Sequence, residues 1–107
     1  MHDLDYIKRH LSETDGTGDP DWVSELHKLV APYPDWKSER VAPSEIDCHC
    51  TDHKTAEAYA EDFASLPAVV LVPSQDSELK FEIVDGGHRV LAALKLGVEV
   101  PALVPSR

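Results

Sequence analysis

Hydrophobic residues recur at helical spacing in the first third of the chain. Leu4, Ile7 and Leu11 fall on one face of a predicted helix. A second helix should begin at Pro20, because Asp19 is a favourable N-cap and proline suits the first helical position. Both helices therefore present one apolar face for packing. The apolar stripe of the second comprises Trp22, Val23, Leu26, Leu29 and Val30.

The middle of the chain changes to shorter, strand-like patterns. Residues 40–46 predict an extended segment, and a helix that ends before Pro67 should follow the polar cluster at 48–53. Residues 69–72 form a continuous aliphatic run, which is typical of a strand buried on both faces. Residues 80–84 predict a second strand, and the polar loop between these two strands indicates a hairpin.

The last part of the chain predicts a turn, a helix and a strand. The segment Asp85-Gly86-Gly87-His88-Arg89, called the glycine turn below, precedes an alanine-rich helix over 90–96 that Gly97 should end. A final strand is predicted over 98–104, at a sheet edge because Pro101 has no backbone N–H. The order of elements predicts an α/β (α+β) fold, in which helices pack on a small mixed sheet.

The length and net charge of the chain limit the classes of function that are compatible with it. A chain of 107 residues suffices for one domain, and its net charge of −10 disfavours broad contact with nucleic acid. Nearly all the acidic excess lies before Ala68, which favours a small anionic ligand bound locally near the glycine turn. No apolar run is long enough for a membrane helix, and the first residues do not resemble a secretory signal. With only Cys48 and Cys50 as cysteines, we expect a cytoplasmic protein with reduced thiols.

The glycine turn is the candidate binding site, and its chemistry suits a phosphate. The first amides of a helix point N–H groups outward at the positive end of the helix dipole. Gly86 and Gly87 let a ligand approach the backbone, while Arg89 offers a guanidinium to phosphate oxygens. His88 can donate a hydrogen bond or transfer a proton. The alternative is structural: Asp85 would cap the helix by accepting from the amide of residue 87 or 88.

The polar cluster at 48–53 also has two interpretations. Asp52 is its only carboxylate, so it is a candidate base for an acceptor hydroxyl or water. It is equally placed to be a helix N-cap ahead of Thr55, and this is the interpretation we favour. A zinc site is not expected, because the four cysteine and histidine residues of this cluster lie within six positions of the chain and no second ligand pair occurs elsewhere. These residues are Cys48, His49, Cys50 and His53.

Large aromatic residues have no interleaved basic patch, so we assign them to packing rather than to base stacking. They are Trp22, Tyr33, Trp36 and Tyr59.

The segment 83–97, followed by Val100-Pro101-Ala102-Leu103-Val104, resembles the ParB/sulfiredoxin superfamily. Members share a strand, a turn of the type D-G-x-H-R or G-E-R-R, an alanine-rich helix, a glycine and a closing V-P strand. The resemblance extends more weakly back through 40–74 and so covers roughly two thirds of the chain. It implies a ParB/sulfiredoxin-like core domain over 39–107, preceded by an N-terminal helical extension over 1–38.

Position 87 separates the branches of this superfamily. Sulfiredoxins have a reactive cysteine just before the His-Arg pair, so Gly87 disfavours sulfinic-acid repair. Partition-type ParB proteins have Glu-Arg-Arg at this place and continue into further helices, so chromosome partitioning is disfavoured. The turn is most similar to Asp-Gly-His-His-Arg of the free-serine kinase branch, whose Asp and His serve the reacting phosphate. The matching residues are Asp85, Gly86, His88 and Arg89.

The resemblance implies a function in phosphate chemistry. The serine kinases also use a carboxylate in the loop before the first long helix, where this chain has Asp52. We therefore expect a nucleotide, ATP or CTP, or another phosphate to bind at residues 86–89, with Mg²⁺ neutralising its charge, for phosphoryl transfer or nucleotide hydrolysis. Asp85, His88 and Asp52 are the catalytic candidates.

Two other functions stay open. One is a ParB-like nuclease acting on nucleic acid, which the acidic charge disfavours. The other is a non-catalytic adaptor, encoded by a mobile element, that binds a protein partner through the acidic N-terminal helices.

Overall fold

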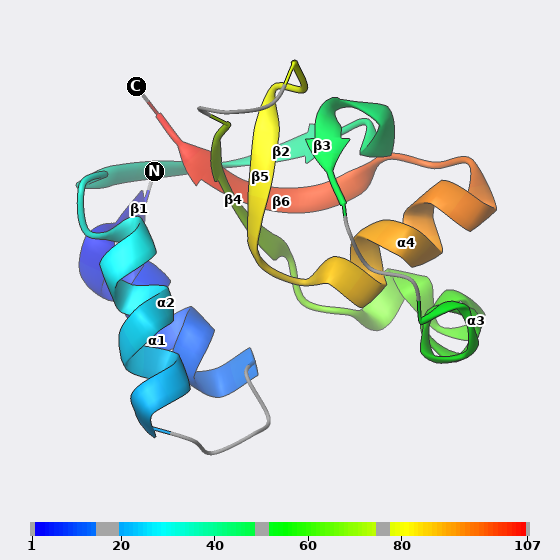
Figure 1. The fold of residues 1–107 in the computed structure, drawn as a ribbon, viewed down its shortest axis with the longest axis horizontal. Helices are drawn as coiled ribbons and strands as arrows, with labels where there is room; N and C mark the ends of the chain where they lie inside the picture. The colour runs from blue at the N-terminus through cyan, green and yellow to red at the C-terminus, as the bar shows by residue number, and fades with distance from the viewer. Residues whose placement is uncertain (1, 15–19, 49–51, 75–77, 107) are drawn as a thin grey trace.

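The computed structural model describes residues 2–14, 20–48, 52–74 and 78–106. These residues form four α-helices and a six-stranded mixed sheet with the strand order β1-β2-β6-β4-β5-β3 (Figure 1). The strands are β1 (His2–Asp3), β2 (Asp35–Val41), β3 (Ile46–Asp47), β4 (Val69–Pro73), β5 (Phe81–Asp85) and β6 (Val100–Pro105). The helices are α1 (Leu4–Thr14), α2 (Pro20–Val30), α3 (His53–Glu61) and α4 (Gly87–Leu96), with short 3₁₀ turns at Pro43–Glu45 and Phe63–Ser65.

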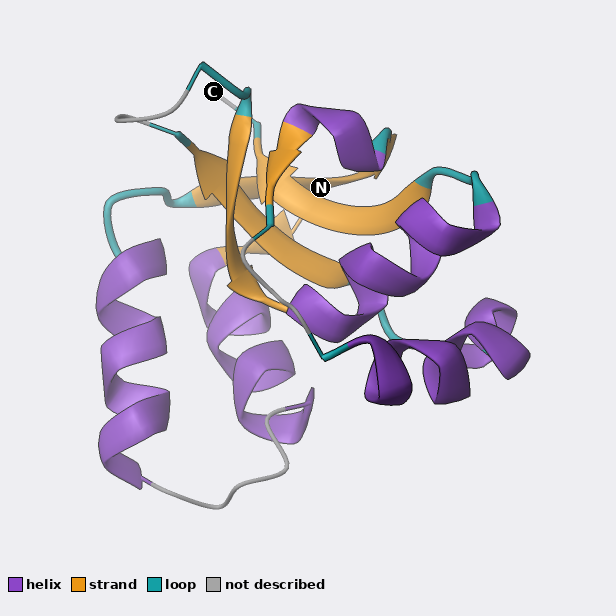
Figure 2. Ribbon diagram, turned by 45° about the vertical axis from the view of Figure 1, so that its right-hand side comes forward, coloured by secondary structure: helices purple, strands orange, loops and turns teal. Residues whose placement is uncertain are grey.

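Helices cover both faces of the sheet (Figure 2). On one face α1 and α2 pack around the fully buried Trp36 and against Val70 and Leu103, through the side chains of Ile7, Leu11, Leu26 and Val30. Leu29, which was predicted to belong to the packed face of α2, is exposed. On the opposite face α4 packs over Leu71 and Val104, and α3 packs against α4. The expected α+β class, with a mixed sheet and packed helices, is confirmed.

Several local predictions are confirmed by these elements. The second helix begins at Pro20, and residues 69–72 form a strand whose side chains are all buried. β4 pairs antiparallel with β5, as the hairpin prediction requires, although residues 75–77 of its loop lie outside the described part of the chain. Gly97 ends α4 in the left-handed conformation, with φ at 69°, and the Val98 amide returns to the Ala93 carbonyl.

The prediction that Pro101 places the last strand at a sheet edge is wrong. β6 lies between β2 and β4 in the interior of the sheet. Pro101 is tolerated there because the pairing with β4 begins only at Ala102, opposite Val69. The missing N–H of Pro101 therefore removes no ladder hydrogen bond on the β4 side.

The structure places the N-terminal residues and the rest of the chain around one sheet. β2 begins at Asp35, five residues before the predicted extended segment, and pairs with β6 from Trp36 to Val41. A boundary between residues 38 and 39 therefore falls inside β2. In the described segments, no helix combines the length and apolar character that crossing a membrane requires.

Candidate functional site

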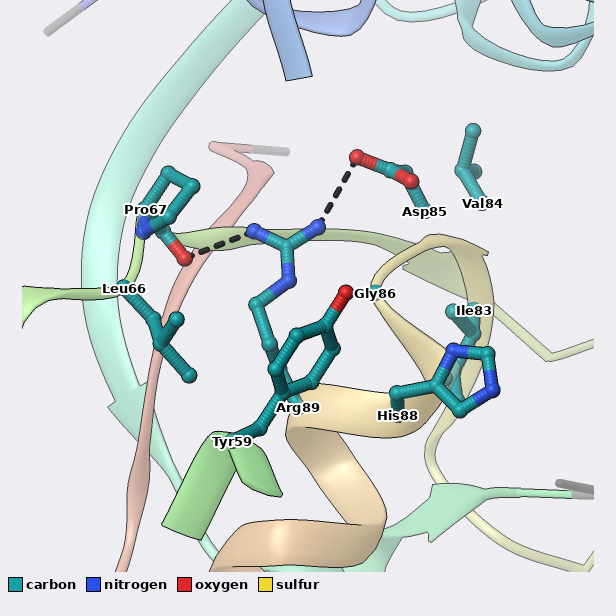
Figure 3. Close-up of a pocket in the computed structure, with 10 residues that line it drawn as sticks. Tyr59, Leu66, Pro67, Ile83, Val84, Asp85, Gly86, His88 and Arg89 are labelled. Atoms are coloured by element: carbon teal, nitrogen blue, oxygen red, sulfur yellow. Dashed lines mark hydrogen bonds and ion pairs between the residues drawn. The ribbon is translucent and has the colours of Figure 1, made fainter. Parts of the chain in front are cut away.

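A cavity of about 410 Å³ lies at the junction of β5 and α4, where the glycine turn is located (Figure 3). One side of it consists of the turn itself, residues 85–89. The other side is largely apolar and includes Tyr59, Leu66, Pro67 and Ile83. The first helical hydrogen bond of α4 runs from the Val90 amide to the Gly86 carbonyl, so the amides of residues 87–89 precede it. The cavity thus combines an electropositive helix end with an apolar wall.

Gly86 fixes the shape of the turn. Its φ of 111° is in the region that side-chain-bearing residues rarely adopt, and a Cβ there would lie 2.4 Å from Cγ1 of Val69. Gly86 is the N-cap residue of α4 and contributes no side-chain cap hydrogen bond. The alternative interpretation of Asp85 as the N-cap is therefore wrong: the helix begins at Gly87, one residue later than a cap at position 85 requires.

Asp85 instead pairs with Arg89 one helical turn later. The Nη2 atom of Arg89 donates to Oδ2 of Asp85 over 2.9 Å, and Nη1 donates to the carbonyls of Pro67 and Ala68 over 2.7 and 3.1 Å. Arg89 is buried, with 7% of its surface exposed. Its guanidinium lines the cavity but is engaged within the protein, so a bidentate grip on phosphate would require these contacts to change.

The carbonyl of Ala68 connects this pair to the N-terminal helices. Nε2 of His10, from α1, lies 2.8 Å from the same Ala68 oxygen that accepts from Arg89. A carbonyl oxygen has two lone pairs, so both contacts can be made together. One backbone oxygen is thereby shared between α1 on one face of the sheet and α4 on the other.

The structure brings Asp52 and His88 together, although they are far apart in the sequence. Oδ2 of Asp52 lies 3.4 Å from Nε2 of His88, and both side chains are about half exposed. Asp52 is also the N-cap of α3, because its Oδ1 accepts from the Thr55 amide over 3.1 Å. The favoured N-cap interpretation is confirmed, and the cap faces the glycine turn.

Hydrogen bonding keeps Asp52 ionised. The pKa of its carboxyl lies below the ordinary value of 3.8, mainly because the Thr55 hydroxyl donates to it, with further lowering by the Thr55 amide and by His88. A carboxylate whose pKa is lowered takes up a proton weakly but stabilises a neighbouring positive charge well. Its chemistry therefore suits an anion that supports an imidazolium better than a general base.

Tyr59 belongs to the site, although the sequence pattern favoured a packing role for it. Its side chain lines the cavity, and its ring meets the ring of His88 edge to face at 5.9 Å between centroids. In Figure 3 the hydroxyl end of Tyr59 points toward Gly86. The spacing Asp52-Thr55-Tyr59, which places these residues on successive turns of one helix, was the available signal. The packing role predicted for Trp36 and Tyr33 is confirmed, because Trp36 is fully buried and Tyr33 meets it edge to face.

The polar cluster before α3 contributes a thiol contact. Cys48 is half-buried, and its Sγ lies 3.8 Å from the Gly87 carbonyl oxygen. Among the described residues no group of three or more His, Cys, Asp or Glu side chains is placed to hold a metal ion. His49 and Cys50, two of the four cysteine and histidine residues in this cluster, lie outside the described residues.

Comparison of the sequence with protein-family models and with curated proteins gives no match.

Proposed function

We propose that the chain is a ParB/sulfiredoxin-like domain that binds a nucleotide, ATP or CTP, or another phosphate ester at the glycine turn. Its chemistry would be phosphoryl transfer or nucleotide hydrolysis, with His88 and Asp52 assisting. The observation that carries this proposal is the cavity that the first turn of α4, the His88 side chain and an apolar wall line together, with Asp52 in contact with His88. The succession of β5, glycine turn, α4 and the V-P strand β6 supports the superfamily assignment.

The two ends of the cavity suit the two parts of a nucleotide. A phosphate group would lie at the amides of residues 87–89, where the helix dipole favours negative charge. A base or another flat group would lie against Tyr59, Leu66 and Pro67. The further proposal that the protein works in the cytoplasm is supported by its low cysteine content, because disulfide-rich small domains are typical of oxidising compartments and this chain has only Cys48 and Cys50.

The carboxylates near the cavity already have partners, which limits how they could bind Mg²⁺. Asp85 is engaged with Arg89, and Asp52 is engaged with Thr55 and His88. The described residues therefore offer no ready-made set of oxygen ligands, and a Mg²⁺ ion would be carried mainly by the phosphates of the nucleotide. None of the roles proposed for the side chains depends on it.

One observation favours the second candidate function, a non-catalytic adaptor. Arg89, the only basic side chain among the residues lining the cavity apart from His88, is committed to internal contacts. A scaffold needs the turn only for its shape, and the helices α1 and α2, in the acidic N-terminal part of the chain, would then bind the partner. The nuclease alternative is left weaker by the net charge of −10.

Thermal unfolding in the presence of ligands tests the proposal. The melting temperature of the wild type should rise with ATP, ADP, CTP or GTP, measured with and without Mg²⁺, because a ligand bound only by the native state stabilises it by about 2.7 kcal/mol at 100 times its Kd. Gly87→Asp places a negative charge at the first turn of α4 and should abolish the rise. Position 87 does not have a positive φ, so this substitution causes no backbone strain.

The matched control is Leu94→Asp, the same change of charge near the other end of α4, where the side chain is exposed. It should keep the ligand-dependent rise. The absence of any rise in the wild type would reject the nucleotide proposal and leave the adaptor as the better account.

A further inference from the structure

The side chain of His88 is held from α3 at one ring nitrogen. Nε2 of His88 lies 3.4 Å from Oδ2 of Asp52. The same Oδ2 accepts from the Thr55 hydroxyl over 2.7 Å, and Oδ1 accepts from the Thr55 amide over 3.1 Å. Both oxygens of Asp52 are thus fixed by the first turn of α3, and the carboxylate cannot rotate away from His88 without losing a cap hydrogen bond.

Tyr59 holds the same ring on a second side. It lies one turn after Thr55 on α3, and its ring meets that of His88 at an angle of 85°. This edge-to-face geometry is a favourable arrangement of two aromatic rings. Since Nε2 faces Asp52, Nδ1 is the ring nitrogen left for a bound substrate.

We infer that Asp52 and Tyr59 are positioning residues for His88, and that Nδ1 of His88 is the atom that exchanges a proton with the bound substrate. This inference rests on the proposed function and assigns roles that differ from the expectation in which Asp52 itself is the base. An acceptor on Nε2–H fixes the tautomer in which Nδ1 carries the free lone pair. The ionised Asp52 then stabilises the imidazolium that forms when Nδ1 takes a proton.

The reaction balances with a phosphoanhydride as donor and water as acceptor. The water oxygen forms a bond to the terminal phosphorus while the bond from that phosphorus to the bridging oxygen breaks. Nδ1 takes the proton that the water loses, and the leaving diphosphate oxygen carries away the bonding electron pair. The imidazolium then returns its proton to solvent or to the leaving group, which restores the starting state.

The test combines turnover with NMR of the His88 ring. Asn caps helices as well as Asp does, so Asp52→Asn should preserve the fold while removing the charge and the acceptor geometry. Release of inorganic phosphate from ATP or CTP with Mg²⁺ should show kcat lowered about 100-fold and KM changed less than about 3-fold. The ¹⁵N shifts of His88 should change from a single tautomer toward a mixture, and the NOE between the His88 and Tyr59 rings should weaken.

Four further variants sharpen the test. Thr55→Val should lower kcat in the same direction, and Thr55→Ser, which keeps the hydroxyl, should restore it. Tyr59→Leu should lower kcat with the ¹⁵N tautomer retained, because the Asp52 contact remains. Asp62→Asn is the charge-matched control at the other end of α3, where Asp62 makes no side-chain cap hydrogen bond; it should leave kcat and the tautomer unchanged.

The possible failures are distinguishable. If the wild type releases phosphate but Asp52→Asn keeps both its kcat and its single tautomer, the positioning inference is overturned while the proposed function stands. If the wild type releases no phosphate and no nucleotide raises its melting temperature, the proposed function fails, and the proton exchange at Nδ1 fails with it.

Discussion

The Nη2 atom of Arg89 lies 2.9 Å from Oδ2 of Asp85, so the two fully charged residues of the glycine turn neutralise each other inside the protein. Their side chains are only 9% and 18% exposed. The arginine also connects the start of α4 to the segment before β4 through two carbonyls. The sequence predicts Arg89 as a phosphate ligand. In the folded chain its side chain instead connects three segments: α4, the end of β5 and the residues before β4.

Replacement of this arginine should therefore destabilise the protein. Arg89→Ala removes the ion pair of the largely buried Asp85 carboxylate with Arg89 and the donors to the carbonyls of Pro67 and Ala68. We expect a loss of about 3–5 kcal/mol in the free energy of unfolding, measured by urea denaturation at neutral pH. Arg89→Lys keeps the positive charge but not the forked geometry of the guanidinium. Its free energy of unfolding should therefore lie between those of the wild type and Arg89→Ala. A loss below about 1 kcal/mol for Arg89→Ala would contradict the structural role.

Replacement by alanine should destabilise the protein to different extents at the two glycines that flank α4, Gly86 and Gly97. Gly97 has a φ of 69°, and a Cβ added there would meet nothing within 4 Å, so Gly97→Ala should cost only the backbone strain, about 1–2 kcal/mol. Gly86→Ala adds a clash with Val69 and should cost more than about 2 kcal/mol. The free energies of unfolding of both variants can be compared by denaturant titration. Equal losses would contradict this prediction, because they would mean that the Val69 side chain moves aside at no cost.

The free energy of unfolding at acidic pH should depend on Asp52. Its pKa is lowered in the folded protein, chiefly by the Thr55 hydroxyl, so the ionised form contributes stability above the ordinary pKa of 3.8. That contribution is lost as the pH falls from this value through the lower folded-state pKa. Unfolding free energies measured from pH 7 to pH 2 should fall more steeply for the wild type than for Asp52→Asn over this acidic window. If the unfolding free energies of the wild type and Asp52→Asn changed in parallel with pH, the contacts of Asp52 with Thr55 and His88 would be contradicted.

A chain reduced to residues 39–107 should not fold cooperatively. It would lack β1, half of β2 and both helices of one layer, and would expose a row of apolar side chains on that face of the sheet. These are Val70, Val72, Val84 and Leu103. We expect a collapsed or aggregated species without a sharp denaturation transition, while the full chain unfolds in a single step. Circular dichroism during denaturation and dispersion of amide NMR signals provide the check.

The sequence predicted elements well where local chemistry decides them. Pro20 after Asp19, the aliphatic run at 69–72 and Gly97 each act within a few residues, and all three are confirmed. β2 was placed too late because Trp36 alone is buried between Asp35 and Arg40, and the strand forms through its pairing with β6. The interior position of β6 is likewise a property of the whole sheet, which Pro101 by itself could not reveal.

The position of the candidate site could be predicted from the sequence, but the roles of the individual residues in the site could not. The glycine turn is marked in the sequence by two adjacent glycines between a strand and a helix. The partner of each charged side chain is set by contacts between segments: Arg89 reaches back to residues 67 and 68, and Asp52 meets His88 across α3 and α4. Tyr59 enters the cavity only because α3 packs beside α4 in this orientation.

The strand order has a kinetic consequence. β2 pairs with β6, the last strand, so residue 36 must find residue 105 before the sheet is complete. Contacts this far apart in the sequence close large loops and slow folding. During synthesis, α1 and α2 emerge from the ribosome well before their sheet exists, and their apolar stripes stay exposed in the meantime. The chain should therefore depend on chaperones, or on dilute conditions, more than its small size suggests.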